Sequence, residues 1–568
     1  MILKDFPIIS FDGGVVRNKS SYAMKKNELL SAYNVEIDEL GRVIRRRGNQ
    51  HYGSYLAHKN SAADVTPAGA ENSFSFAKNA VSAASSTSML VNDNATSGVV
   101  VRIIGSRLAG AITSASTTID LISSSDFATG VTAFVEIEGD LITYTGVNAN
   151  QLTGVTGITS SHAIGVPVHT TIQITQPSTA FDFTQGGYYA IADSSSISWD
   201  NCFVSSRNVL DYSASGGNFS GTPIKFTDGA TPNVGVLFLV NYRDRFYGAG
   251  SGASATLTID GANRVFYSAL GDGTSWTMTN YFDIKDQSGD ITSGLKVFND
   301  VLNIFKRSSF YSYNQVSLKK RSSIVGAYNN KVIQEVNGLM YTFCPSGIWI
   351  TNGISHRKIS KPVEEYIKNF KPQFDDNTRV ITNTFAFKYG DNYCVYLGNI
   401  TKPETQSNVI LVYNTIKKNW SVFFTDIQWL HANSFSRYLF GGRLQETEGV
   451  FAGSVTSGTP TYRFWKLFSN EHLNGAGNSF GGDLKLDTFF NTGVDIAAHF
   501  ETPLYDLATP QYIKKFKYIR GLSEVVGWNA EYRIEDKVGV SGYKPIGQFQ
   551  RPNQRLAIPN TPLGYRIG

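Results

Sequence analysis

Residues 244–248 read Asp244-Arg245-Phe246-Tyr247-Gly248, a turn residue followed by an aromatic-rich strand. The same phrase returns at residues 300–305, 337–341, 391–396 and 437–442. The steps between equivalent positions are 56, 37, 54 and 45 residues, which scatter around the roughly 40 to 50 residues of a four-stranded propeller blade. The repeat therefore predicts a β-propeller as the main body. It also weakens the case for an enzyme, because it carries no reactive constellation of side chains.

The composition points to β structure in several modules. A chain of 568 residues exceeds the roughly 250 to 300 residues at which a single core stops growing. It contains 36 Phe, 29 Tyr and 53 Gly but 5 Met, and β-rich proteins favour aromatic residues in strands. We expect an all-β fold with few long helices.

Five segments differ in composition and pattern. The N-terminal segment is basic and irregular, and the stretch from about residue 106 contains a Glu-Gly-Asp turn between two alternating strands, which predicts a hairpin. The predicted boundaries are an N-terminal assembly segment at 1–60, the start of the propeller at 61–105, an inserted small β domain at 106–170, propeller blades at 171–484, and a C-terminal β segment with an extended docking tail at 485–568.

Charge is unevenly distributed along the chain. Residues 1–60 carry 10 Lys/Arg and 6 Asp/Glu, residues 61–300 carry 10 and 20, and residues 301–568 carry 31 and 20. Such blocks suggest a large particle whose faces meet different partners, and solvated surfaces of uneven charge explain them equally well. Nucleic acid is one candidate among these partners.

The positions of the cysteines and the hydropathy of the chain limit the cellular compartments in which we expect the protein. Cys202, Cys344 and Cys394 lie far apart in strand-like contexts, so buried free thiols are expected rather than disulfides or a zinc site. No apolar run approaches the roughly 20 residues of a membrane span, and the N-terminus lacks a signal-peptide pattern. We expect synthesis in a reducing cytoplasm and no membrane span.

Basic residues form the candidate contact sites. We expect subunit or ring contacts from an N-terminal arm and from a proline-dotted tail, at Arg42, Arg45, Arg46, Arg47, Arg551 and Arg555. The arm fits protein contacts better than phosphate, because alternate side chains of a strand point to opposite faces. A second patch, for nucleic acid or an interface, comprises Lys306, Arg307, Lys319, Lys320 and Arg321. The aromatic residues at 310–313, interleaved with these cations, could stack on the bases of single-stranded nucleic acid. Their alternation is also typical of strands that pack in a core, and we favour core packing.

No pattern predicts catalysis, a cofactor or a metal. The pairs Glu364-Glu365 and Asp375-Asp376 offer carboxylates for glycan cleavage, but adjacent side chains diverge and make a poor acid/base pair. The acids at 283, 286 and 290 lack EF-hand spacing, and Gly248-Ala249-Gly250-Ser251-Gly252 lacks the helix that a phosphate cradle needs. A non-enzymatic protein without cofactors is expected.

Three passages together resemble the propeller-bearing tail proteins of short-tailed bacteriophages, known as the nozzle, tail tubular protein B or packaged-DNA stabilisation (tail hub) family. The first passage comprises Gly13-Gly14, Asn34-Val35-Glu36-Ile37-Asp38, Gly41-Arg42-Val43 and Arg46-Arg47-Gly48. The second comprises residues 264–276, 290–295 and 302–311, and the third comprises 347–353 and 358–363. The resemblance is spread over about half of the chain. It is carried by the order of the motifs rather than by any one of them, and the irregular blade spacing departs from the family's pattern.

The resemblance implies a structural virion protein in a phage tail, made in the host cytoplasm. It implies a homohexameric ring that lines the DNA exit channel, touches genomic double-stranded DNA in passing, and docks adjacent tail or adaptor ring proteins and fibres or spikes. The alternative reading is a carbohydrate-binding or glycan-cleaving propeller on a tail or cell surface. A third is a head-to-tail stopper or fibre adaptor.

Overall fold

Strands dominate the computed structural model of the chain. It describes most of residues 10–46, 100–173, 202–250, 263–284, 292–374 and 381–425, with short gaps, and separate strands elsewhere between residues 50 and 567. Among these residues one short α-helix occurs, α1 (Glu364–Lys368), beside the single-turn 3-10 helices η5 (Asn330–Val332) and η6 (Lys361–Val363). The prediction of an all-β fold is confirmed. No helix in the described part is long and apolar enough to cross a membrane.

Four antiparallel sheets of four strands follow one another along the chain between residues 238 and 425. The first contains β19 (Phe238–Tyr242), β20 (Arg245–Ala249), β21 (Arg264–Ala269) and β22 (Asp272–Asp283). The second contains β23 (Thr292–Phe298), β24 (Val301–Lys306), β25 (Phe310–Tyr313) and β26 (Leu318–Ser322). The third contains β27 (Gln334–Val336), β28 (Leu339–Cys344), β29 (Gly347–Thr351) and β30 (His356–Lys358). The fourth contains β31 (Phe385–Tyr389), β32 (Asn392–Thr401), β33 (Gln406–Asn414) and β34 (Asn419–Thr425).

The recurring sequence phrase marks the first hairpin of each of these sheets. A two-residue loop joins the first strand to the second, and its backbone has positive φ at 243–244, 299–300 and 337–338 and at Gly390. Two-residue hairpins of this type need positive φ, which Asp, Asn and Gly tolerate best. The aromatic or aliphatic residues that follow form the buried second strand. The last phrase, at 437–442, lies largely outside the described residues.

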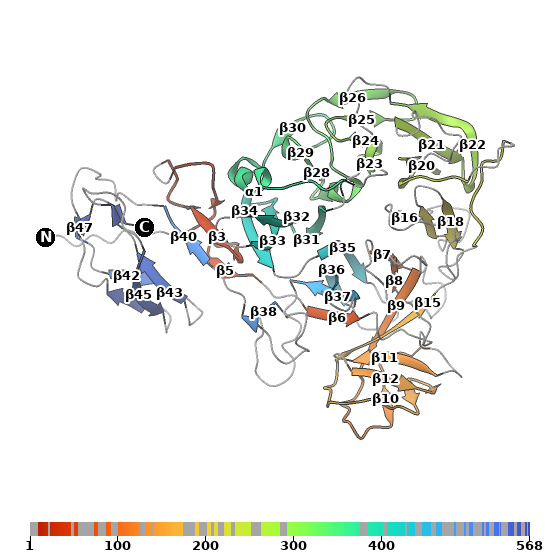
Figure 1. Cartoon of the computed structure of the whole chain (residues 1–568), viewed down its shortest axis with the longest axis horizontal. Coiled ribbons are helices and arrows are strands. Elements are labelled where there is room, and N and C mark those ends of the chain that lie inside the picture. The colour runs from red at the N-terminus through yellow and green to blue at the C-terminus, as the bar shows by residue number, and fades with distance from the viewer. Residues whose placement is uncertain are drawn as a thin grey trace.

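Further sheets flank this series on both sides. One has the order β35 (Trp429–Arg437), β36 (Glu446–Val455), β37 (Tyr462–Leu467) and β6 (Gln50–Ser54), so that an N-terminal strand supplies its fourth member. Another contains β16 (Tyr188–Ile191), β17 (Cys202–Ser205) and β18 (Leu210–Ser213). First strands of neighbouring sheets contact one another, including β16 with β19, β19 with β23, β27 with β31 and β31 with β35. Figure 1 shows the sheets following one another in an arc.

A small β insert interrupts one sheet. The strands β7 (Ser73–Ala77), β8 (Thr87–Asn92), β9 (Val100–Arg107) and β15 (Pro167–Gln173) pair in that order, and two strands of the insert continue the sheet beyond β15. The insert, defined here as residues 108–166, lies between β9 and β15. It contains β10 (Thr118–Asp120), β11 (Ala133–Ile137), β12 (Asp140–Tyr144), β13 (Gly146–Asn148) and β14 (Gln151–Thr153). Among the described residues, its buried core comprises residues between 108 and 158 together with Val168 of β15. The predicted hairpin forms, with β11 paired to β12.

The two ends of the chain meet beside the fourth sheet. The N-terminal strands are β1 (Gly14–Val15), β2 (Glu28–Leu29), β3 (Ser31–Tyr33), β4 (Val35–Ile37) and β5 (Val43–Arg45). The C-terminal strands are β38 (Gly482–Asp483), β39 (Val494–Asp495), β40 (His499–Glu501), β41 (Lys514–Lys515), β42 (Tyr518–Gly521), β43 (Trp528–Tyr532), β44 (Ile534–Glu535), β45 (Lys544–Phe549), β46 (Gln554–Ala557), β47 (Leu563–Gly564) and β48 (Arg566–Ile567). Because β3 pairs with β40, the terminal strands form one region, at the left of Figure 1.

Candidate functional site

The described N-terminal segment, residues 10–46, covers the outer strand of the fourth sheet. Asn34 has a φ of 56°, and its side-chain oxygen accepts hydrogen bonds from the Phe424 amide at 2.8 Å and from Arg46 Nε at 3.0 Å. A terminal nitrogen of Arg46 donates to the Phe424 carbonyl at 3.1 Å. The Asn34 amide also donates to the Val422 carbonyl at 2.8 Å. One asparagine and one arginine therefore satisfy backbone groups at the edge of this strand.

The four arginines of the basic arm have different positions. Arg46 is 2% exposed and its guanidinium lies 5.7 Å from the centre of the Phe423 ring. Arg42 is exposed and pairs with Asp38, four residues before it. Arg45 belongs to β5, whose backbone pairs with β4, and Arg47 lies outside the described residues. Arg46 thus joins two parts of its own chain and is buried within it.

Close backbone approach explains the glycines of the first motif. Gly14 has a φ of 66°, and a Cβ added there would lie 2.8 Å from the carbonyl oxygen of Trp420. Beside it, Asn419 Nδ2 donates to the Asp12 carbonyl at 2.9 Å, and Lys417 Nζ donates to the Ile37 carbonyl at 3.0 Å. A residue other than glycine at position 14 would hold the N-terminal segment away from β34.

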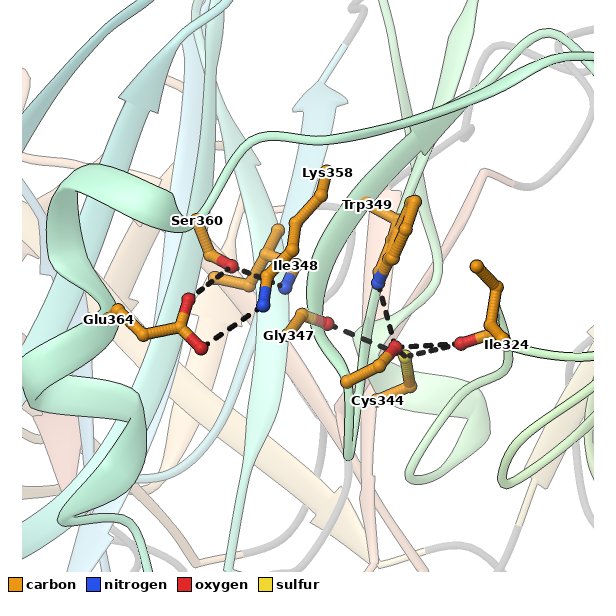
Figure 2. A network of polar contacts seen from close by, with 9 residues as sticks. Ile324, Cys344, Gly347, Ile348, Trp349, Lys358, Ser360 and Glu364 are labelled. Atoms are coloured by element: carbon orange, nitrogen blue, oxygen red, sulfur yellow. Dashed lines mark hydrogen bonds and ion pairs between the residues drawn. The ribbon is translucent and has the colours of Figure 1, made fainter.

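A second contact joins the N-terminal segment to the third sheet through α1. Figure 2 shows Ser360 donating towards Glu364 and accepting from the Ile348 amide, with Oγ–N 3.1 Å, while Lys358 Nζ lies 3.0 Å from Glu364 Oε1. Glu365 points to another partner, because its Oε2 lies 2.9 Å from Arg17 Nε. The two nominated carboxylates are therefore separated into different ion pairs, as expected for adjacent side chains.

The other half of the Figure 2 network fixes the turn between β28 and β29. The Ser346 hydroxyl donates to the Ile324 carbonyl at 2.6 Å and accepts from Trp349 Nε1 at 2.8 Å. The Cys344 sulfur lies 3.1 Å from the same hydroxyl. Burial raises the pKa of the Cys344 thiol, as it does that of Cys394. Both are free thiols, and a buried protonated thiol is a poor nucleophile. The side chain of Cys202 lies outside the described residues.

The C-terminal region is attached through the N-terminal segment. Alongside the β3–β40 pair, the Tyr33 ring stacks on both His499 and Phe424, each at 5.2 Å between centroids. Phe11 packs against Phe500 with 5.8 Å between centroids. Of the predicted tail contacts, Arg555 lies in β46, whose backbone pairs with β42, and Arg551 lies outside the described residues.

The second basic run divides between core and surface. Lys306 is fully buried, and Arg307 lies 5.6 Å from the ring centre of Phe374. The aromatics Phe310 and Tyr311 are buried too, which matches the core-packing alternative. The run leaves one exposed set, which is Lys319, Lys320 and Arg321 on β26. We name this strand with its three cations the basic edge.

The remaining acidic candidates form no shared site. Asp283 pairs with Arg264 at 2.8 Å, and positions 286, 290, 375 and 376 lie outside the described residues. Gly248 belongs to β20, and Gly250 has a φ of 72° at its end. Within the described part of the chain, no group of three His, Cys, Asp or Glu residues is placed to hold a metal ion.

Comparisons with known proteins give no family. No family model and no curated protein matches the chain. A solved structure of BamB from Moraxella catarrhalis is 10% identical, with a TM-score of 0.29 over 66% of this chain and 94% of that one. A structure of BBS1N in complex with ARL6DN is also 10% identical, with a TM-score of 0.32 over 74% and 98% of the two chains. At these TM-scores neither likeness bears on fold or function.

Proposed function

We propose that this chain is a structural protein of a bacteriophage tail, a nozzle or tail tubular ring subunit that lines the DNA exit channel and docks neighbouring tail proteins or fibres. In this proposal the successive sheets close into one β-propeller, with β6 as the final strand of its last blade. The protein has no catalytic role in it. Copies of the propeller form the wall of a homohexameric ring in the virion.

The proposal is supported by one observation: the N-terminal motif that resembles the tail-protein family lies in the part of the N-terminal segment that contacts β34. Gly14 of that motif allows the close approach to β34, and Asn34 and Arg46 form hydrogen bonds with it. Through β3 the same segment holds the C-terminal region. Such a subunit has a stiff body of sheets and two attached regions, the insert and the joined termini, which suits contacts with different neighbours in an assembly.

Mass measurement and imaging of the purified full chain test the proposal. Native mass spectrometry and negative-stain images are expected to show closed rings of six copies without hydrolysis of polysaccharides. A monomer at every concentration that cleaves or binds a glycan would overturn the proposal in favour of the carbohydrate-active alternative. Rings with a different copy number would overturn the hexamer.

A further inference from the structure

We infer that the basic edge of one copy binds the acidic insert of a second copy of this chain, and that this contact closes the ring. The inference rests on the proposed function, because it names the contact between neighbouring subunits. The first observation behind it is that β26 is exposed. The strand pairs with β25 on one side, and its residues Leu318 to Arg321 are exposed.

Two of the three cations of the basic edge contact neighbouring side chains of β25. Arg321 Nε donates to the Ser312 hydroxyl at 2.6 Å, and Lys320 Nζ lies 5.8 Å from the centre of the Tyr311 ring. His356 Nε2 contacts the Arg321 carbonyl at 3.1 Å. Side chains that are ordered before binding lose less conformational entropy when a partner arrives.

Apolar residues at both ends of β26 indicate a docking surface. Lysines alone are explained by protection of a sheet edge against unwanted pairing. Protection does not explain Val316 at 90% exposure and Ile324 at 58%, which flank the cations. Apolar residues among charges are typical of a surface that a partner covers.

Charge complementarity selects the occupant. The basic edge carries three exposed cations in a stretch, residues 301–331, that contains no acid, whereas the insert has five acids and no Lys or Arg in its sequence. Of these acids, Asp140 is buried inside the insert. On the insert, Asp120 is exposed on β10, and Ile164 is 65% exposed. Both surfaces therefore combine an exposed apolar residue with charge of one sign, and the signs are opposite.

The two surfaces cannot meet within one chain. Figure 1 shows β26 at the top of the molecule and β10 to β12 at the bottom. A contact between them joins different patches of two copies, and such a head-to-tail contact generates a ring when the rotation closes. Duplex DNA is the rival occupant of a basic strand, but it offers no match for the exposed apolar residues.

Paired charge reversals in the full chain test this contact. The edge variant is Lys319→Glu with Lys320→Glu, the insert variant is Asp120→Lys, and a combined variant carries all three changes. The control is Lys368→Glu with Lys371→Glu, two exposed cations beside α1. Sedimentation velocity over a concentration series is run at about 0.1 M salt, with thermal unfolding of every variant.

Each reversal is expected to raise the concentration needed for assembly by about tenfold or more, and the combined variant to restore it, while the control behaves as wild type. Assembly of the edge and insert variants at the wild-type concentration would overturn the contact and leave the proposed ring intact. So would a failure of the combined variant to recover while it unfolds at the wild-type temperature. A monomeric wild type would overturn the ring itself.

Fluorescence anisotropy measures duplex-DNA binding by the same variants. If the edge variant loses duplex-DNA binding while its assembly is unchanged, the basic edge is assigned to DNA.

Discussion

The outer strands β34 and β26 occupy the same place in two of the four-stranded sheets and have opposite surroundings. On β34, Trp420 and Val422 are buried in a core that they share with the N-terminal segment, and Phe423 is buried in a second core with Phe468. On β26, the residues from Leu318 to Arg321, which include the three cations, are exposed. The chain thus covers an apolar edge with its own N-terminus and leaves a basic edge open. An uncovered edge that still carries apolar residues is the one expected to receive another molecule.

The largest expected effect on stability comes from removing Trp420, the side chain of β34 that packs in the core shared with the N-terminal segment. Trp420 is 1% exposed, and its Nε1 donates to the Ile359 carbonyl at 2.9 Å. Trp420→Ala leaves a large cavity and an unpaired carbonyl, so we expect a loss of about 4 kcal/mol in the free energy of unfolding. The matched change on the open edge, Leu318→Ala, is expected to cost less than about 1 kcal/mol. Denaturant unfolding of both variants measures the difference, and similar losses would show that the two edges are covered alike.

Arg46→Ala has the next largest expected effect. The change removes the donors to Asn34 and to the Phe424 carbonyl in a buried place, and we expect a cost of roughly 3 kcal/mol. Arg42→Ala is the control, because its exposed ion pair with Asp38 contributes below about 1 kcal/mol. Hydrogen exchange should show faster exchange in β34 for Arg46→Ala alone. Equal exchange in the two variants would mean that Arg46 does not hold the N-terminal segment on β34.

Local sequence signals predicted the strands well. The phrase of a turn residue and an aromatic strand identified the hairpins at 243–244, 299–300 and 337–338, because two-residue loops with positive φ restrict which residues are allowed. The hairpin of β11 and β12, the buried thiols of Cys344 and Cys394, and the divergence of Glu364 from Glu365 followed from equally local rules.

Contacts between residues far apart in the sequence could not be predicted from the sequence. The hydrogen bond from Phe424 to Asn34 joins residues 390 positions apart, and no periodicity carries that information. The sequence therefore predicts Arg46 as a subunit or ring contact, and it does not identify Asn34, Asn419 or Arg17 as partners of the sheets. One weak signal was available, since Asn34 precedes a strand and has the residue type that tolerates positive φ.

The smallest expected effect concerns the insert, the proposed partner of the basic edge. Asp140 accepts hydrogen bonds from the Thr159 amide at 2.8 Å, the Ser160 amide at 2.9 Å and His162 Nε2 at 2.9 Å. Burial raises the pKa of Asp140, but the hydrogen bonds from Thr159, His162 and Ser160 outweigh it and lower the pKa from 3.8 to about 2. A folded-state pKa below the unfolded one stabilises the fold above that unfolded value, and the stabilisation is lost as pH falls from about 4 to about 2.

Asp140→Asn is therefore expected to lose roughly 2 kcal/mol of local stability in the insert at neutral pH and to show no further acid dependence in this window. Hydrogen exchange of peptides from the insert, compared at pH 7 and pH 3, measures it, with peptides from β34 as the internal reference. Since none of the residues described in the core of the insert belongs to β34 or to the N-terminal segment, exchange in β34 should stay unchanged. Faster exchange in both regions would mean that the insert and the covered edge unfold as one unit, and the contact between copies would then depend on the N-terminal segment as well as on charge.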